Sequence, residues 1–336
     1  MAGLPSPRVP ILLTAPGREV PDLRRRSSRV IPSAMRPSAL MIVAVMIADM
    51  GLRSDAPPTE AHHGATGSTA PDAETPGKRP GSEFRVARHG FAFRNSFSGS
   101  PLPTALRRAT SGWENALRGT IERNFELPKE FGLCGGMCLA AADFFHAGLA
   151  IPRMETPPQA GTPLYEYLYQ RQVESWGKAS VYALKFLRWM RLPDTGTDSP
   201  SERSVAELGT IATSVRAGEL VPIGLVLVRH AEEGARNGGK PWENHQVLCW
   251  KVEPREGGVG VDLHVYDPNF PKDEGVVIRV SNATGDGKKP APDRPVMLAR
   301  LTSSGKATPV RGVFAMPYER KDVPEELARA STDHEP

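Results

Sequence analysis

The chain has 336 residues, a formal net charge of +4 and a hydrophobic fraction of 39%, which together allow one or two domains. Much of the basic excess lies near the N-terminus, and the rest of the chain has no basic stripe with interleaved aromatic residues, so we expect no nucleic-acid partner. The three cysteines are an odd number in a chain long enough to fold without bridges, which argues against a disulfide framework.

The first 82 residues are dense in Pro, Ser, Arg, Ala and Gly, and no aromatic residue precedes Phe84. Such a segment cannot bury enough apolar surface to offset the entropy lost on ordering, so we predict a disordered tail over 1–82. Its apolar run 39–48 is too short to span a bilayer, although its length matches the core of a signal peptide. We therefore expect a cytoplasmic protein with no stable membrane span, and secretion through 39–48 is the alternative.

A folded domain is predicted over 83–320, the part of the chain that contains its aromatic residues. Alternating apolar residues over 84–97 predict an extended arm packed on this domain. The apolar residues over 110–126 recur at approximately helical spacing, which predicts a helix that ends before Pro128.

Helical patterns continue to residue 217. A glycine-rich turn followed by an alanine-rich run predicts a helix that begins near Cys134 and ends at Gly148. Two helices are predicted within 164–190 and another over 204–217. We expect the apolar residues within 164–190 to form core, namely Tyr165, Leu168, Val173, Val181, Leu184, Leu187, Trp189 and Met190.

After residue 217 the pattern changes to short apolar strands separated by Gly, Pro, Asn and Asp. The predicted strands are 221–228, 245–252, 261–266, 276–280 and 313–316. Helices followed by strands indicate an α+β domain rather than an alternating parallel one. The charged end of the chain, 321–336, is predicted to be a second disordered tail.

Cys134 lies where a thiolate forms most easily. Unpaired N–H groups and the positive end of the helix dipole at a helix N-terminus favour an anionic sulfur, which is the form that attacks carbonyls. Cys138 follows one turn later and is open to several interpretations: a metal partner, a resolving thiol, a core residue or an alternative nucleophile. It lies inside the helix, where fewer N–H groups are free, so Cys134 is the better candidate. Cys249 is in mid-strand and is expected to be buried.

His245 and Asp267 are predicted to lie side by side. His245 opens one apolar strand, and Asp267 ends the next strand along the chain. In two neighbouring antiparallel strands the start of the first lies beside the end of the second. The carboxylate can then bind one ring nitrogen while the other nitrogen faces the thiol of Cys134. These three residues form a candidate nucleophile, base and orienting group.

Three short motifs carry a resemblance to a known family. The chain has Phe-Gly-Leu-Cys-Gly-Gly-Met from Phe131, Asn-His-Gln-Val-Leu from Asn244 and Val-Tyr-Asp-Pro-Asn from Val265. This combination resembles the papain-like cysteine peptidases, most of all their bacteriocin-processing branch. It is also similar to a set of uncharacterised bacterial proteins grouped with that fold. The resemblance covers roughly 84–318.

The resemblance implies an α+β fold in which an N-terminal helical part, with the cysteine at a helix N-terminus, packs on a C-terminal antiparallel sheet. It implies Cys134 as nucleophile, His245 as general acid and base, and Asp267 as the residue that orients the histidine. The family pattern has an oxyanion glutamine about six residues before the cysteine, where this chain has Pro128. Asn124 and Asn95 are candidate oxyanion donors in place of the glutamine. The backbone N–H of Cys134 is a further donor.

The function expected from these residues is thiol hydrolysis by a cysteine peptidase or amidase, acting through an acyl-enzyme on a peptide or a small amide or ester. No cofactor and no metal site are expected, because the chain has no phosphate-binding glycine loop, no dinucleotide fingerprint and no zinc pattern. The missing glutamine motivates an alternative, a catalytically silent papain-like domain that acts as a binding or scaffolding protein. The sequence does not indicate an oligomeric state.

Overall fold

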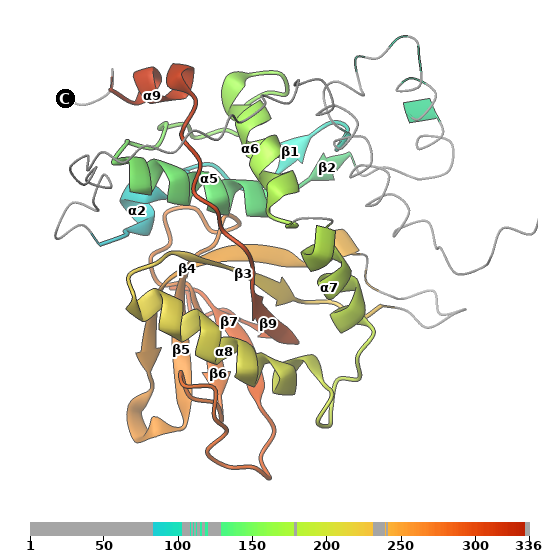
Figure 1. The fold of residues 1–336 in the computed structure, drawn as a ribbon, viewed down its shortest axis with the longest axis vertical. Helices are drawn as coiled ribbons and strands as arrows, with labels where there is room; N and C mark the ends of the chain where they lie inside the picture. The colour runs from blue at the N-terminus through green and yellow to red at the C-terminus, as the bar shows by residue number, and fades with distance from the viewer. Residues whose placement is uncertain are drawn as a thin grey trace, which may run out of the picture. The chain divides into compact units, whose positions relative to one another are not determined.

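The computed structural model describes residues 83–102, 129–177, 180–230 and 241–332, together with Gly239 and six isolated positions between 108 and 119. The predicted tail 1–82 lies outside the described residues, as does most of the predicted helix 110–126 with Asn124 and Pro128. In the described part helices precede an antiparallel sheet (Figure 1), which confirms the α+β class. None of the described helices is both long and apolar enough to cross a membrane.

The first half of the domain consists of helices and one small two-stranded sheet. Its elements are α2 (Val86–His89), β1 (Phe97–Ser98), β2 (Glu130–Phe131), α5 (Cys134–Ala147), α6 (Pro163–Glu174), α7 (Val181–Met190) and α8 (Pro200–Arg216). Strands β1 and β2 pair antiparallel. The helices predicted at Cys134, within 164–190 and over 204–217 are therefore confirmed, and the last of them begins four residues earlier, at Pro200.

The arm 84–97 is buried as predicted, but it is not wholly extended. The backbone N–H of Arg85 donates to Nδ1 of His89 at 2.8 Å, which closes the single turn of α2. Its apolar side chains still enter the core, with Phe91 and Phe93 at 0% exposure. Packing against the domain, rather than strand pairing, accounts for the alternation of apolar residues.

The second half of the domain is a seven-stranded sheet in the order β8-β7-β6-β5-β4-β3-β9, in which all neighbours are antiparallel. The strands are β3 (Val221–Val226), β4 (His245–Pro254), β5 (Gly260–Tyr266), β6 (Val277–Ser281), β7 (Met297–Leu301), β8 (Ala307–Val310) and β9 (Gly312–Ala315). All five predicted strands are present. Strands β7 and β8 were not predicted, because only Leu298 and Val310 in them are buried apolar residues.

Helices cover the sheet on both faces. Leu208 and Ile211 of α8 pack with Ile223 and Val247 in one apolar cluster. On the other side, α5 packs against β4 and β3, and its cluster includes Leu248 and Tyr266. Helix α7 covers the β3 and β9 end, with Phe186 and Phe314 in edge contact. Two predicted core residues of α7, Val181 and Leu184, are instead each 55% exposed, since the face that packs on Phe314 carries Phe186 and Trp189.

A buried carboxylate on α5 holds the C-terminal segment of the domain. Asp143 accepts hydrogen bonds from Tyr167, Tyr318 and the backbone N–H of Lys321, at 2.8, 3.0 and 2.9 Å, and it pairs with buried Arg171. The chain beyond Lys321 was predicted to be disordered, but it forms helix α9 (Glu325–Thr332), and Leu327 packs into the core. The anchor at Asp143 brings this charged segment to the domain. Residues 333–336 lie outside the described part.

Helix α5 approaches α6 too closely for a side chain at Gly136. A Cβ placed there would lie 2.0 Å from the backbone oxygen of Leu168. Glycine is therefore required by the packing of the two helices, which lie next to each other (Figure 1).

We predict that Gly136→Ala lowers the free energy of unfolding by about 3 kcal/mol, because a backbone oxygen cannot move aside as a flexible side chain does. Gly209→Ala is the matched control in α8, where the nearest atom would be 3.6 Å from the new Cβ. This control should be neutral or stabilising by up to about 1 kcal/mol, since alanine favours helix. Urea unfolding measures both variants, and equal stabilities would contradict the packing argument.

Candidate active site

Cys134 is the first residue of α5 and lines a pocket. The first intrahelical bond is donated by Met137 to the oxygen of Leu133, and the N–H groups of Cys134 and Gly135 have no partner among the described residues. Cys134 is partly exposed, whereas Cys138 and Cys249 are buried. The predicted position of this thiol at a helix N-terminus is therefore confirmed, and the sulfur is open to a ligand.

His245 and Asp267 are brought together by the pairing of β4 with β5. Leu248 lies opposite Tyr266, so the start of β4 is beside the end of β5. Nε2 of His245 lies 2.6 Å from Oδ1 of Asp267 and donates to it. The Cys134 thiol also interacts with the imidazole, because it contributes to the raised pKa of His245, and Nδ1 is the ring nitrogen that Asp267 does not engage. The structure thus brings the three predicted residues into one chain of contacts.

The Asp267 carboxylate is fully buried and has three donors. Besides His245, the backbone N–H of Asn269 donates to Oδ1 at 2.9 Å, and Nη1 of Arg300 donates to Oδ2 at 3.0 Å. The Arg300 guanidinium lies over the ring of Phe270, 4.9 Å from its centroid. Burial raises the pKa of Asp267, but the charge and hydrogen bond of His245 and the charge of Arg300 outweigh it, and the net pKa is lowered. Asp267 is therefore an anion at neutral pH.

The pKa of His245 is raised to about 10. Burial by itself lowers this pKa, but the charge and hydrogen bond of Asp267, followed by the contact with Cys134, raise it by more. His245 is consequently an imidazolium at neutral pH. A cation at this place is the natural counter-ion of a thiolate.

The other two thiols have environments that keep them neutral. Burial, followed by the charges of Cys134 and Asp267, raises the pKa of Cys138 well above its ordinary value. Burial raises the pKa of Cys249 to about 12. Of the interpretations open for Cys138, the structure favours a core residue, since its side chain is 0% exposed and its sulfur contacts the backbone oxygen of Gln246 at 3.6 Å.

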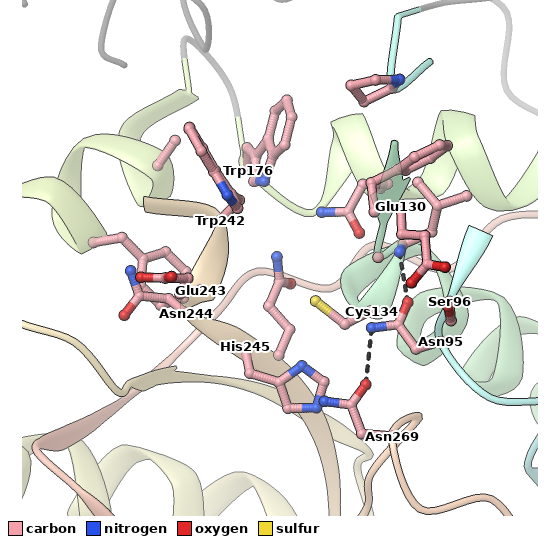
Figure 2. A pocket seen from close by; sticks show the side chains of 18 of the residues that line it. Asn95, Ser96, Glu130, Cys134, Trp176, Trp242, Glu243, Asn244, His245 and Asn269 are labelled. Carbon is pink, nitrogen blue, oxygen red and sulfur yellow. Dashed lines mark hydrogen bonds between the residues drawn. The ribbon is translucent and has the colours of Figure 1, made fainter. Parts of the chain in front are cut away.

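Asn95 forms hydrogen bonds to two separate segments of the site, one before the thiol and one after Asp267. Its Oδ1 accepts from the backbone N–H of Leu133 at 2.6 Å, and its Nδ2 donates to Oδ1 of Asn269 at 3.1 Å. Figure 2 shows both bonds as dashed lines, with the Asn95 amide beside Cys134. The side chain thus connects the residue before the thiol to the turn that follows Asp267. Asn124, the other candidate oxyanion donor, lies outside the described residues.

The pocket around the thiol has a volume of about 470 Å³, within the range of small-molecule and peptide sites. Figure 2 shows Trp176 and Trp242 on one side of the Cys134 sulfur, and Asn95, Ser96 and Glu130 on the other. Trp242 is 42% exposed, so the aromatic side opens to solvent. Glu243 and Asn244 lie on the same side as Trp242, so polar and apolar side chains together line the pocket around the sulfur and the imidazole.

Several residues of this site were missed by sequence reasoning. Asn269 and Gln246 are inside the motifs that identified Asp267 and His245, so their positions were detectable. Arg300 is on β7, a strand that was not predicted, and Trp176 follows α6 without any local signal. The contacts of these residues depend on chain segments far apart in the sequence.

Among the described residues, no His, Cys, Asp and Glu side chains gather in a group of three that could hold a metal ion. Comparison with known proteins yields no match to a protein-family model, to a curated protein or to a solved structure.

We predict that a small electrophile such as iodoacetamide alkylates the native protein at Cys134 near neutral pH. Cys134→Ala should abolish this labelling, because the remaining thiols are buried and protonated, whereas Cys138→Ala and Cys249→Ala should leave it intact. Peptide mapping by mass spectrometry identifies the labelled residue. Equal labelling of all three cysteines, or of none, would contradict the assignment of Cys134 as the reactive thiol.

We also predict that His245 is protonated at pH 8. Its folded pKa of about 10 lies above the ordinary 6.5, so the stability that it contributes is complete below about pH 6.5 and is lost as the pH rises toward 10. In Asp267→Asn the main cause of the raised pKa is gone, and the ring should be neutral at pH 8. Imidazole nitrogen NMR shifts distinguish the two forms. An imidazolium that persists in this variant would refute the role given to Asp267.

Proposed function

We propose that the protein is a thiol hydrolase of the papain-like type, a cysteine peptidase or amidase. The observation that carries this proposal is the chain of contacts from Cys134 through His245 to Asp267 beside an open pocket. A partly exposed sulfur at a helix N-terminus, next to an imidazolium held by a buried carboxylate, is the arrangement of an activated nucleophile. The order of helices and antiparallel strands is compatible with a papain-like fold.

In this mechanism the thiolate of Cys134 attacks the carbonyl carbon of a bound amide or ester. A sulfur–carbon bond forms, and the carbonyl oxygen becomes an oxyanion. When the bond to the leaving group breaks, His245 gives its proton to the leaving amine or alcohol. Water then attacks the acyl-enzyme and passes a proton back to His245, and the sulfur–carbon bond breaks to restore the thiolate. Asp267 keeps the ring oriented and balances its charge throughout.

Two of the oxyanion donors expected from the sequence lie in the described part of the chain. The N–H of Cys134 points from the start of α5 and has no protein partner there. Nδ2 of Asn95 has two hydrogens and donates one of them to Asn269. Its second hydrogen would serve the oxyanion in place of the glutamine of the family pattern.

The pocket supports a peptide or a small amide or ester as the substrate, because it is open and is lined by both apolar and polar side chains around the sulfur. We keep the cytoplasm as the proposed compartment. All three cysteines are free thiols, which suits a reducing environment.

A second candidate function is binding or scaffolding without turnover. The observation that favours it is the engagement of the Asn95 amide on both sides, by Leu133 and by Asn269. An amide held in this way has a structural role. Without its contribution the oxyanion hole would be incomplete, and the pocket would bind a ligand but not hydrolyse it.

Incubation of the protein with a diverse library of peptides, amides and esters tests the proposal. We predict turnover by wild type and by Cys138→Ala, and none by Cys134→Ala. Asp267→Asn should lower kcat by about 10²-fold or more, because the imidazole loses its orienting charge. Turnover that survives in Cys134→Ala would refute the mechanism. Alkylation of Cys134 without turnover of any library member would favour the binding function.

A further inference from the structure

A network of buried amides surrounds the N-terminal turn of α5. The N–H of Gly136 donates to Oε1 of Gln172 at 3.1 Å, and the Ser175 hydroxyl donates to the backbone oxygen of Gln172 at 2.7 Å. Nε2 of Gln246, the residue after the candidate base His245, donates to Oγ of Ser175 at 3.1 Å. Gln172 and Gln246 both line the pocket that holds the thiol.

This network determines which way the Gln246 amide points. The single hydrogen of the Ser175 hydroxyl is given to Gln172, so Oγ of Ser175 can only accept from a further neighbour. The atom of Gln246 next to Ser175 must then be the nitrogen, and the other atom is the oxygen Oε1.

Oε1 of Gln246 is a buried acceptor that lacks a donor within the described part of the chain. The side chain is 3% exposed, and Oε1 lies against Gly135, where a Cβ would be only 2.5 Å away. Gly135 directly follows the thiol residue Cys134. The room for Oε1 therefore exists because residue 135 has no side chain, and this buried, unpaired acceptor belongs to a residue that lines the pocket and lies beside the residue that follows Cys134.

An acceptor of this kind selects a ligand that brings a donor. An unpaired buried oxygen is costly, and a ligand N–H removes that cost, whereas a ligand that lacks the donor leaves it in place. Three groups around the sulfur are donors, namely the free N–H groups of Cys134 and Gly135 and the His245 ring. They suit the carbonyl oxygen and the leaving group, so Oε1 complements them with the opposite polarity.

We propose that Oε1 of Gln246 accepts an amide N–H of the substrate next to the carbonyl that Cys134 attacks. Gln246 is then a specificity-determining residue, and the substrate class is narrowed to amides with a free N–H at this position, as in a peptide, over esters and depsipeptides. This inference rests on the proposed thiol hydrolase function for the identity of the attacked carbonyl.

Two chloromethyl ketones that differ by one group test the proposal. The probes are acetamidomethyl chloromethyl ketone, which has the N–H, and acetoxymethyl chloromethyl ketone, in which oxygen replaces it. With either probe the Cys134 thiolate forms a bond to the carbon that bears the chlorine, and chloride leaves. The rate of Cys134 alkylation is measured for each and divided by the rate of the same probe with glutathione.

We expect the wild type to prefer the N–H probe by about threefold to tenfold, the effect of one hydrogen bond. Gln246→Met should reduce this preference to about one. Gln246→Glu keeps an acceptor oxygen and should retain a preference, which covers the case that the methionine variant fails to fold. Gln170→Met is the matched control, because Gln170 is exposed on α6 and does not line the pocket.

A wild type that reacts equally with both probes, or with neither, overturns the proposal, as does a preference that survives in a folded Gln246→Met. These outcomes are separate from those of the substrate library. If no library member is hydrolysed but the N–H preference is present and depends on Gln246, the binding role of this residue stands and hydrolysis fails. If amides and esters are hydrolysed without any preference, hydrolysis stands and the role of Gln246 fails.

Discussion

The buried carboxylate of Asp267 is the interaction on which the rest of the site depends. It is fully removed from solvent, and an isolated buried charge would be very costly, so each of its oxygens must have partners. Oδ1 accepts from His245 and from the N–H of Asn269, and Oδ2 accepts from Arg300. One anion therefore orients the imidazole, keeps it protonated, and ties β4, β5 and β7 together at the pocket.

A second constraint is the close packing of the first turn of α5. Gly135 and Gly136 leave no room for side chains, since their Cβ positions would lie 2.4 Å from Oγ of Ser175 and 2.0 Å from the oxygen of Leu168. This contact brings the helix N-terminus, and Cys134 with it, against α6 and β4. The neighbouring thiol of Cys138 is buried by that packing and stays neutral.

The buried polar groups around α5 form two networks on opposite sides of this helix. Asp143 is nine positions after Cys134, which places it on the other side of the helix, where it holds the C-terminal segment through Tyr318 and Lys321. In that network all partners of the carboxylate are protein groups. In the network at the thiol, the oxygen of Gln246 remains unpaired among the described residues.

The sequence by itself determined the α+β class, the start of a helix at Cys134 and the adjacency of His245 and Asp267, because these follow from local periodicity, turn residues and the geometry of one hairpin. It did not determine strands β7 and β8, the exposure of Val181 and Leu184, or the ordered helix α9. Nor did it identify Arg300 beside Asp267, or the bridge from Asn95 to Asn269, whose partners are 174 positions apart. Only the tertiary structure decided these, since which side chain meets a buried charge or amide depends on long-range packing that no local pattern records.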